Sequence, residues 1–284
     1  MLILTYKNSI GEVVMHGAGS AAPFRITAIE GLGLVSKEYE VATYSGCNGQ
    51  ETLGARALAR SITIAVEAVH EDVSKILRNA IDVFCEPGVL YISDNDIKRR
   101  IKCNQIQIPD TSRILKGRIS SFAIQLVCDN PYFEDEKDTI TPLYQQTKLL
   151  SSPFELPTSF GGFVIGGSIN ISGVVPVEPI ITIHFPTALG EAETITLNNA
   201  TTGKTITLEY APQEKDVVMI DIKNRKITSS INGNIINFLS LDTFLGDFIL
   251  EPGKNVIKVS VGDISSGFTI ECRHNNLHNE AVIA

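Results

Sequence analysis

The stretch Leu126–Asp135, LVCDNPYFED, marks the point at which this chain changes character. An apolar strand pattern ends at Asp129-Asn130-Pro131, because proline has no N–H group for a strand ladder, and the aromatic residues Tyr132 and Phe133 follow. Before this corner the sequence is rich in strand patterns and contains one helix pattern. After it, a connector punctuated by proline and glycine leads into a second strand-rich half. We therefore predict a mainly β chain with two domains.

The first half alternates apolar and polar residues with the period of a β-strand. The pattern is found in Phe24–Ile29, Ser61–Glu67, Lys102–Ile108 and Gly117–Cys128. In the last of these the phase slips between Ile119 and Phe122, which predicts a β-bulge near Ser120-Ser121.

One helix is predicted between these strands. Its apolar stripe recurs at steps of three and four residues and consists of Val73, Ile76, Leu77, Ala80, Ile81 and Phe84. Glu71 and Asp72 are expected in its first turn, and Pro87-Gly88 ends it. A single helix with one apolar face must cover a sheet. Residues 1–135 are therefore predicted to form a β-sandwich-like domain with one packed helix.

The second half reads as strands about eight to twelve residues apart with turn signals between them, which is typical of an antiparallel β-sandwich. The candidates are Ile180–Phe185, Glu193–Leu197, Lys204–Tyr210, Asp216–Ile222, Lys226–Ser229, Ile235–Phe238, Val256–Val261 and Phe268–Cys272. Asn232-Gly233 predicts a two-residue hairpin loop. We assign residues 169–284 to this sandwich. Residues 136–168 are a connector too apolar for a free linker, expected to pack on a domain or on a neighbouring subunit.

Composition narrows the function classes. Apolar residues make up 43% of the chain, yet no run approaches the roughly 18 apolar residues of a membrane-spanning helix. The N-terminus has no basic region and no long apolar core, so no export signal is predicted and the protein is expected to be made and kept in the cytoplasm until it is assembled. The five cysteines, Cys47, Cys85, Cys103, Cys128 and Cys272, are odd in number and widely spaced, which favours reduced thiols over a disulfide framework or a zinc site.

The charge is distributed unevenly. Residues 1–150 hold 16 Lys and Arg against 18 Asp and Glu, and residues 151–284 hold 8 against 14. An acidic second half argues against nucleic acid as a specific partner, because phosphate binding relies on clustered basic residues. The cluster Lys98-Arg99-Arg100 with Lys102 is interpreted as a solvated strand start, and Glu134–Glu136 with Asp138 as a solvated charge run.

No pattern in the chain predicts a catalytic, cofactor or metal site. Gly17–Ala22 fits G-x-G-x-x-A, but a strand rather than a helix is predicted to follow, so a flexible loop is favoured over a dinucleotide site. Cys272, His274 and His278 could bind zinc, but a fourth ligand is not evident. The remaining histidines are isolated, the acidic pair Asp94 and Asp96 lies in a turn, and nucleophile-elbow and H-E-x-x-H patterns are absent. We predict that the protein is not an enzyme.

An ordered series of segments resembles the distal tail (Dit) family of long-tailed bacteriophages. The series runs through Phe24–Leu34, Arg60–Glu67, the helix, Pro87–Tyr91, the D-x-P-Y-F corner, Asn170–Pro179, the turn Asn198–Gly203, Asn232-Gly233 and Leu250–Asn255. The resemblance implies an N-terminal domain that forms a six-membered ring at the tip of the tail tube. It also implies a galectin-like C-terminal β-sandwich on the outside of the ring.

The implied partners are further copies of the chain, the tail tube protein, the tail-associated hub or lysin protein and a receptor-binding protein, and the implied location is the virion tail tip. The loop Tyr44–Arg56 and the connector are expected to contribute to interfaces. The alternative is a glycan-binding adhesin module. Sugar sites usually stack on exposed aromatics, and in a chain without tryptophan Tyr210 or Phe244 would have to serve.

Overall fold

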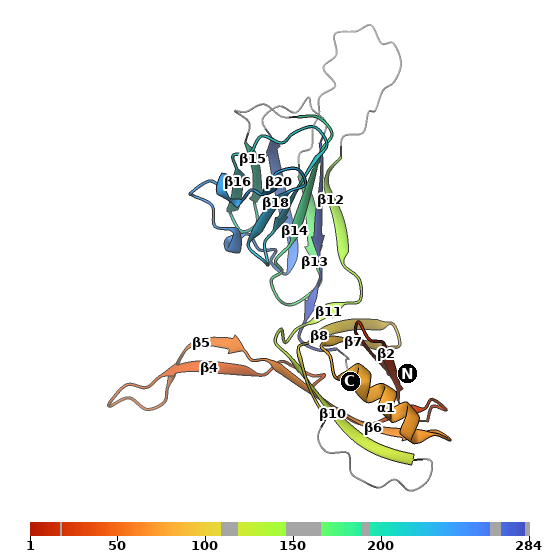
Figure 1. Cartoon of the computed structure of the whole chain (residues 1–284). Coiled ribbons are helices and arrows are strands. Elements are labelled where there is room, and N and C mark those ends of the chain that lie inside the picture. The colour runs from red at the N-terminus through yellow and green to blue at the C-terminus, as the bar shows by residue number, and fades with distance from the viewer. Residues whose placement is uncertain (18, 109–118, 146–165, 189–193, 262–267, 282–284) are drawn as a thin grey trace, which may run out of the picture. The chain divides into compact units, whose positions relative to one another are not determined.

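Figure 1 shows the computed structural model of the chain, which describes residues 1–17, 19–108, 119–145, 166–188, 194–261 and 268–281. They divide into two compact units. Unit 1 is Met1–Glu136 together with the segment that begins at Leu277, and unit 2 is Lys137–Asn276. Strands dominate the described elements of both units, which confirms the mainly β fold.

Unit 1 contains a ten-stranded sheet and a separate two-stranded ribbon. The strands of the large sheet are β1 (Ile3–Lys7), β2 (Glu12–His16), β3 (Phe24–Glu30), β6 (Arg60–Val69), β7 (Gly88–Asp94), β8 (Ile97–Cys103), β9 (Gln105–Gln107), β10 (Ile119–Cys128), β11 (Phe133–Asp135) and β22 (Leu277–His278). The ribbon consists of β4 (Lys37–Ala42) and β5 (Glu51–Ala57).

The large sheet curls back on itself. Its strand order is β22-β11-β8-β7-β1-β2-β3-β6-β10-β9, so β8 lies near one end and β9 at the other. In the chain, however, β8 and β9 are separated by Asn104 alone, and the backbone N–H of Asn104 donates to the carbonyl of Val127 on β10, at 2.9 Å. This junction between β8 and β10, which we call the seam, brings the two ends of the sheet together.

The predicted helix is confirmed as α1 (Val73–Phe84). Asp72 is its N-cap, whose side chain accepts from the backbone N–H of Lys75 at 3.1 Å. Glu71 and Asp72 thus precede the helix rather than occupying its first turn, where a capping carboxylate still suits the dipole. Val73, Ala80, Val83 and Phe84 are buried, and the helix packs against β2 and β6. No described helix has the length and apolar character needed to cross a membrane.

The core of unit 1 follows the predicted alternation. Ile62, Ile64 and Val66 of β6 are buried, and β10 pairs antiparallel with β6 in one unbroken register from Ile119 to Cys128. The expected bulge near Ser120-Ser121 is therefore wrong. The phase slips because Ser120, a polar residue, is on the buried side with 4% of its surface exposed.

Unit 2 is an antiparallel β-sandwich of two sheets. The six-stranded sheet has the order β12-β21-β14-β17-β18-β19 and the four-stranded sheet the order β13-β20-β15-β16. The strands are β12 (Thr139–Gln145), β13 (Gly166–Ile171), β14 (Ile180–Phe185), β15 (Ile195–Asn199), β16 (Lys204–Leu208), β17 (Asp216–Asp221), β18 (Lys226–Ser229), β19 (Gly233–Asn234), β20 (Gly253–Val261) and β21 (Thr269–His274). Alternate residues of β14, β15, β17 and β20 point into the core between the sheets.

Three expectations for the second half need correction. Ile235–Phe238 is not a strand: residues Ile236–Phe238 form the 3-10 helix η1, followed by the 3-10 helix η2 (Leu245–Asp247). Ser229 pairs with Gly233, so the hairpin loop at Asn232-Gly233 has three residues rather than two.

The division of the chain also differs at both ends of the expected sandwich. Strand β12 of the connector belongs to unit 2, where Leu143 is buried, and the segment from Leu277 belongs to unit 1. Residues 146–165 of the connector lie outside the described residues.

Gly31, which follows β3, carries a testable constraint. Its φ is +91°, and a Cβ atom at this position would lie 2.2 Å from the carbonyl oxygen of Ser61. We expect Gly31→Ala to lower the free energy of unfolding by about 2 kcal/mol, since it combines backbone strain with a steric clash. Gly33→Ala is the matched control, because nothing lies within 4 Å of a Cβ there. Urea unfolding of both variants checks this, and equal stabilities would contradict it.

Candidate protein–protein interface

The ribbon of β4 and β5 forms a hairpin arm, residues 37–57, that projects from unit 1 (Figure 1). Its two strands pair with each other and form a sheet of their own. Nearly all residues of both strands are exposed. A two-stranded ribbon is at best marginally stable in water on its own, so this arm has the character of an element that docks on a partner.

The arm carries large apolar side chains in solvent. The exposed fractions are 60% for Tyr39, 43% for Val41, 57% for Tyr44 and 58% for Leu53. Such side chains clustered on one projecting element are typical of an interaction surface, whereas single exposed apolar residues are ordinary. Tyrosine is moreover a frequent anchor in protein interfaces.

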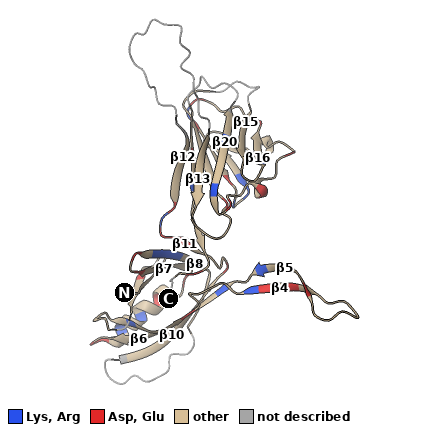
Figure 2. Ribbon diagram, turned by 180° about the vertical axis from the view of Figure 1, so that it is seen from behind, with Lys and Arg blue, Asp and Glu red and all other residues tan. Residues whose placement is uncertain are grey.

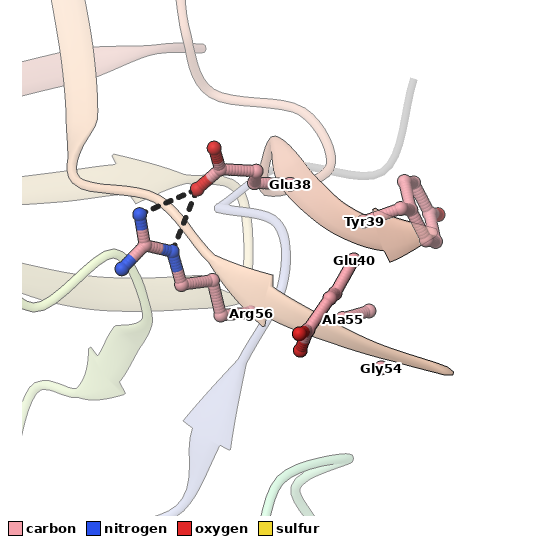
Figure 3. A pocket seen from close by; sticks show the side chains of 6 residues that line it. All are labelled: Glu38, Tyr39, Glu40, Gly54, Ala55 and Arg56. Atoms are coloured by element: carbon pink, nitrogen blue, oxygen red, sulfur yellow. Dashed lines mark hydrogen bonds and ion pairs between the residues drawn. The ribbon is translucent and has the colours of Figure 1, made fainter. Parts of the chain in front are cut away.

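The two faces of the arm differ chemically. Tyr39 is opposite Ala55 in the ladder, and Glu38 is opposite Arg56. Because neighbouring residues of a strand point to opposite faces, Tyr39 and Ala55 share an apolar face, while Glu38, Glu40 and Arg56 share a charged one. The guanidinium of Arg56 contacts Glu38 Oε2 through Nε and Nη2, both at 2.6 Å (Figure 3).

A shallow depression lies on the arm itself. It is lined by Glu38, Tyr39, Glu40, Gly54, Ala55 and Arg56 (Figure 3). Its walls come from only two strands, with no further layer behind them. A surface of this kind suits a protein segment laid along the arm better than an enclosed small molecule, for which pockets are concave and mostly apolar.

Elsewhere in unit 1, two charge runs that the sequence analysis treated as solvated face each other. Strand β8 pairs with β11, which places Lys98–Arg100 beside Glu134–Glu136; Figure 2 shows basic residues in blue near the β8 and β11 labels. Arg100 Nε is 3.0 Å from Glu134 Oε2, Lys98 Nζ is 3.7 Å from Glu136 Oε2, and Arg99 forms an ion pair with Asp135. The basic cluster is thus largely neutralised within the fold.

His278 of β22 joins this cluster, with Nε2 3.1 Å from Asp135 Oδ1. Burial and the positive charge of Arg99 lower the pKa of His278, although Asp135 opposes the shift. The pairing of β22 with β11 fastens the segment from Leu277 to unit 1.

A buried arginine holds the corner Leu126–Asp135. Arg60 of β6 has 5% of its surface exposed, and its guanidinium carbon lies 4.4 Å from the ring centre of Phe133. The guanidinium donates hydrogen bonds to four backbone carbonyls, those of Pro131 at 2.6 Å, Gly31 at 2.5 Å, Gly33 at 2.8 Å and Asn279 at 2.6 Å. Burial lowers the pKa of Arg60, and the neighbouring Cys128 opposes that shift.

Unit 2 contains a buried polar network centred on Asp216. Its carboxylate accepts from the Tyr210 hydroxyl at 2.6 Å, from Ser229 at 2.7 and 2.8 Å and from Ser230 at 2.9 Å. Burial acts to raise the pKa of Asp216, but these hydrogen bonds outweigh it and lower the pKa. Every donor is an alcohol or phenol held by another bond, so the network is a structural support rather than a catalytic arrangement.

The residues that the sequence suggested for a metal site divide between the two units. Cys272 and His274 are buried on β21 of unit 2, and His278 belongs to unit 1. Burial raises the pKa of the Cys272 thiol to about 12. Within the described ranges, no group of three His, Cys, Asp or Glu residues could hold a metal ion. After Gly17 the chain leads into strand β3 at Phe24 and not into a helix.

The two aromatic residues named for a glycan site differ in their exposure to solvent. Tyr210 has 3% of its surface exposed and its hydroxyl is committed to Asp216, so it cannot stack on a sugar. Phe244 has 70% of its surface exposed, and Leu241, three residues before it in the sequence, has 97% exposed.

Comparison with known proteins agrees with this architecture. Residues 172–274 match the family model described as siphovirus-type tail component, C-terminal domain. The crystal structure of the Dit protein of phage SPP1, described as a paradigm of the hub adsorption apparatus of phages infecting Gram-positive bacteria, superposes with a TM-score of 0.67. At 13% identity, the match covers 97% of this chain and 99% of the SPP1 protein.

A chain of the phage p2 baseplate in its activated conformation with strontium matches with a TM-score of 0.52 and 12% identity, over 96% of this chain and 98% of the other. No curated protein sequence matches. Residues 172–274 of unit 2 thus resemble the C-terminal domain of siphovirus-type tail components. The chain shares the fold of the SPP1 Dit protein, and the resemblance to the distal tail family is confirmed.

The hairpin arm is longer than the loop Tyr44–Arg56 that the sequence predicts at an interface, because it also includes β4, Lys37–Ala42. The signal was present as the alternation of Lys37, Tyr39 and Val41 with Glu38 and Glu40. It was missed because both faces of the strand are solvent-exposed, so no buried face marks it.

Proposed function

We propose that copies of this chain form a closed hexameric ring at the distal end of a phage tail. The ring would join the tail tube to the tail-associated hub or lysin protein and to a receptor-binding protein. The observation that carries the proposal is the hairpin arm, which exposes Tyr39, Val41 and Leu53 on a ribbon too small to be stable alone. The siphovirus-type tail component domain at residues 172–274 supports a structural role in a tail.

Ring closure follows from a simple geometric rule. When one surface of a subunit binds a different surface of the next, the assembly closes if the rotation between them divides a full turn. An arm of unit 1 that docks on the neighbouring copy provides such an unlike pair of surfaces. A durable contact of this kind buries about 1,600 Å² or more of surface. Both faces of the two-stranded arm can contribute to that buried surface.

The mass of the purified protein in solution tests the ring. Light scattering after size exclusion should give six times the chain mass of 30.9 kDa for the protein alone, or a complex that contains six copies of the chain after addition of the tube or hub protein, and averaged negative-stain images should show a six-fold ring. A species that stays at the mass of one chain under both conditions would contradict the proposal.

Tyr39→Asp should weaken ring formation strongly. Tyr39 is the most exposed aromatic of the arm, and a tyrosine that acts as an interface hot spot contributes about 2 kcal/mol or more to binding. We therefore expect the midpoint concentration for assembly to rise at least about tenfold, since each 1.4 kcal/mol is a factor of ten. Concentration-dependent light scattering measures this midpoint.

Leu241→Asp is the matched control, because Leu241 is even more exposed but belongs to unit 2. Both variants should keep the wild-type melting temperature to within about 2 °C, since surface substitutions rarely alter stability by more than ~0.5 kcal/mol. If the midpoint concentration for assembly is unchanged in Tyr39→Asp, the arm is not part of the interface.

Of the two aromatics named for the glycan-binding alternative, Phe244 is the one that is exposed. A glycan array with selective hits that are lost in Phe244→Ala would favour it. A ring of six copies with no such hits would favour the structural role.

A further inference from the structure

Two buried thiols meet at the seam of the ten-stranded sheet. Cys103 is the last residue of β8 and Cys128 the last residue of β10. Their sulfur atoms are 3.5 Å apart, and neither side chain is exposed to solvent. A disulfide bond has a sulfur–sulfur distance of about 2.05 Å, so the two atoms need to approach by only about 1.5 Å.

The pair differs from the other cysteines of the chain. Cys47 and Cys85 are exposed, and Cys272 is buried in unit 2. Cys103 and Cys128 are therefore a buried pair within unit 1, and the bond they could form would connect the two strands that close the sheet.

A buried positive charge lies next to one of the thiols. Cys128 is directly opposite Arg60 in the ladder between β10 and β6, and side chains at such positions share one face of the sheet. Among the contacts of the described residues, the Arg60 guanidinium has backbone carbonyls and the Phe133 ring as partners, and no carboxylate. A thiolate at Cys128 would be stabilised by the positive charge of this guanidinium.

The surroundings shift the pKa values of the two thiols in opposite directions. The hydrogen bond with Cys103 lowers the pKa of Cys128, and the charge of Arg60 adds to this effect against burial. The pKa of Cys103 is raised by the same hydrogen bond and by burial. Cys128 is thus the thiol that reaches the reactive thiolate form more readily.

The residues that follow the two thiols reach the surface. Asp129, which follows Cys128, is exposed, and Asn104, which follows Cys103, is partly exposed. Asn104 Nδ2 donates to Asp129 Oδ2 at 2.6 Å. The sulfur atoms themselves are buried, so a small oxidant such as hydrogen peroxide reaches them through local opening of the seam.

We propose that Cys103 and Cys128 form an intramolecular disulfide bond when the protein meets a peroxide, which staples the seam of unit 1 covalently. The Cys128 thiolate attacks one peroxide oxygen, the O–O bond breaks, and a sulfenic acid and hydroxide form. The Cys103 thiol then displaces the sulfenic hydroxyl, forming the S–S bond. In sum, two thiols are oxidised, one peroxide is reduced, and two waters are released. The inference is independent of ring formation.

Thiol mapping of the full chain tests the proposal. The folded, reduced protein is first treated with N-ethylmaleimide, which blocks the exposed Cys47 and Cys85. It is then exposed to hydrogen peroxide, denatured, treated with a second alkylating reagent and digested. We expect one cross-linked peptide pair, lighter by two hydrogens, that joins Cys103 to Cys128, while Cys272 takes the second reagent.

A stability measurement adds an independent readout. Closing the loop between the two cysteines should raise the melting temperature of unit 1 by about 5–10 °C, and dithiothreitol should reverse the rise. In Cys128→Ser, peroxide should produce no such rise. Should this variant fail to fold, mapping of the wild-type chain still decides.

Two results would overturn the proposal. In one, Cys103 and Cys128 both take the second reagent after peroxide treatment. In the other, either is converted to a sulfinic acid with no cross-linked peptide.

Discussion

Arg60→Leu is expected to destabilise unit 1 by about 3–5 kcal/mol, the largest effect of any single substitution considered. The variant leaves buried backbone carbonyls without their charged donor, and each unsatisfied buried group costs about 1–3 kcal/mol. It also removes the contact between the guanidinium and the ring of Phe133. The carbonyls belong to three separate segments of the chain, so the loss loosens the corner at Pro131 and the segment beyond Leu277 together.

Hydrogen exchange followed by mass spectrometry localises this effect. Peptides from β6 and β10 should lose protection in Arg60→Leu, whereas peptides from β14 and β17 of unit 2 should not. Arg60→Lys should recover only part of the stability, because a single ammonium group cannot reproduce the forked geometry of the guanidinium. Arg56→Leu, at an exposed arginine, should cost less than about 1 kcal/mol. Equal protection in the Arg60 and Arg56 variants would contradict the assignment.

Asp216→Asn is expected to lower the stability of unit 2 by about 3 kcal/mol. The carboxylate is fully buried and accepts hydrogen bonds from Tyr210, Ser229 and Ser230. An amide in its place presents an NH2 group to those hydroxyl donors, so at least one buried polar group loses its partner. Asp242→Asn, at an exposed aspartate, is the control and should remain within about 0.5 kcal/mol of wild type.

The pH dependence of this difference follows from the pKa shift. The pKa of Asp216 is lower in the folded than in the unfolded chain, where it is about 3.9. Its contribution is therefore fully present above the unfolded pKa and is lost as the pH falls through the folded pKa. Urea unfolding at pH 7 and at successively lower values below pH 4 should show the gap between wild type and Asp216→Asn shrinking. A gap that is constant over this range would show that ionisation of Asp216 does not support the fold.

The sequence predicted the elements that have one buried face. The stripe of α1 and the alternation of β6 appear where they were expected, because burial imposes a period that can be counted. The strand β4 was not predicted, since neither face is buried and the alternation of Lys37–Val41 looks like that of an exposed loop. Ile235–Phe238 has strand-like composition but forms a 3-10 helix, because a short apolar segment does not determine its own backbone conformation.

Contacts between segments that are distant in the chain could not be predicted from local sequence patterns. The charge runs Lys98–Arg100 and Glu134–Glu136 each look solvated when considered alone, and only the pairing of β8 with β11 brings them together. In the same way, nothing near Arg60 in sequence indicates that its partners come from Gly31, Pro131 and Asn279. The proximity of Cys103 and Cys128 depends on the curl of the sheet, which local periodicity does not report.

The return of the chain to unit 1 at Leu277 makes unit 2 a domain inserted between two strands of unit 1. Residues 137–276 leave from the end of β11 and come back at the start of β22, two strands that pair antiparallel as neighbours. A short turn could join these strands in place of the whole sandwich, in the way that domain insertions are accommodated at the ends of adjacent strands. Removal of residues 137–276 in this way would leave β11 and β22 paired in the sheet of unit 1 and joined in one chain.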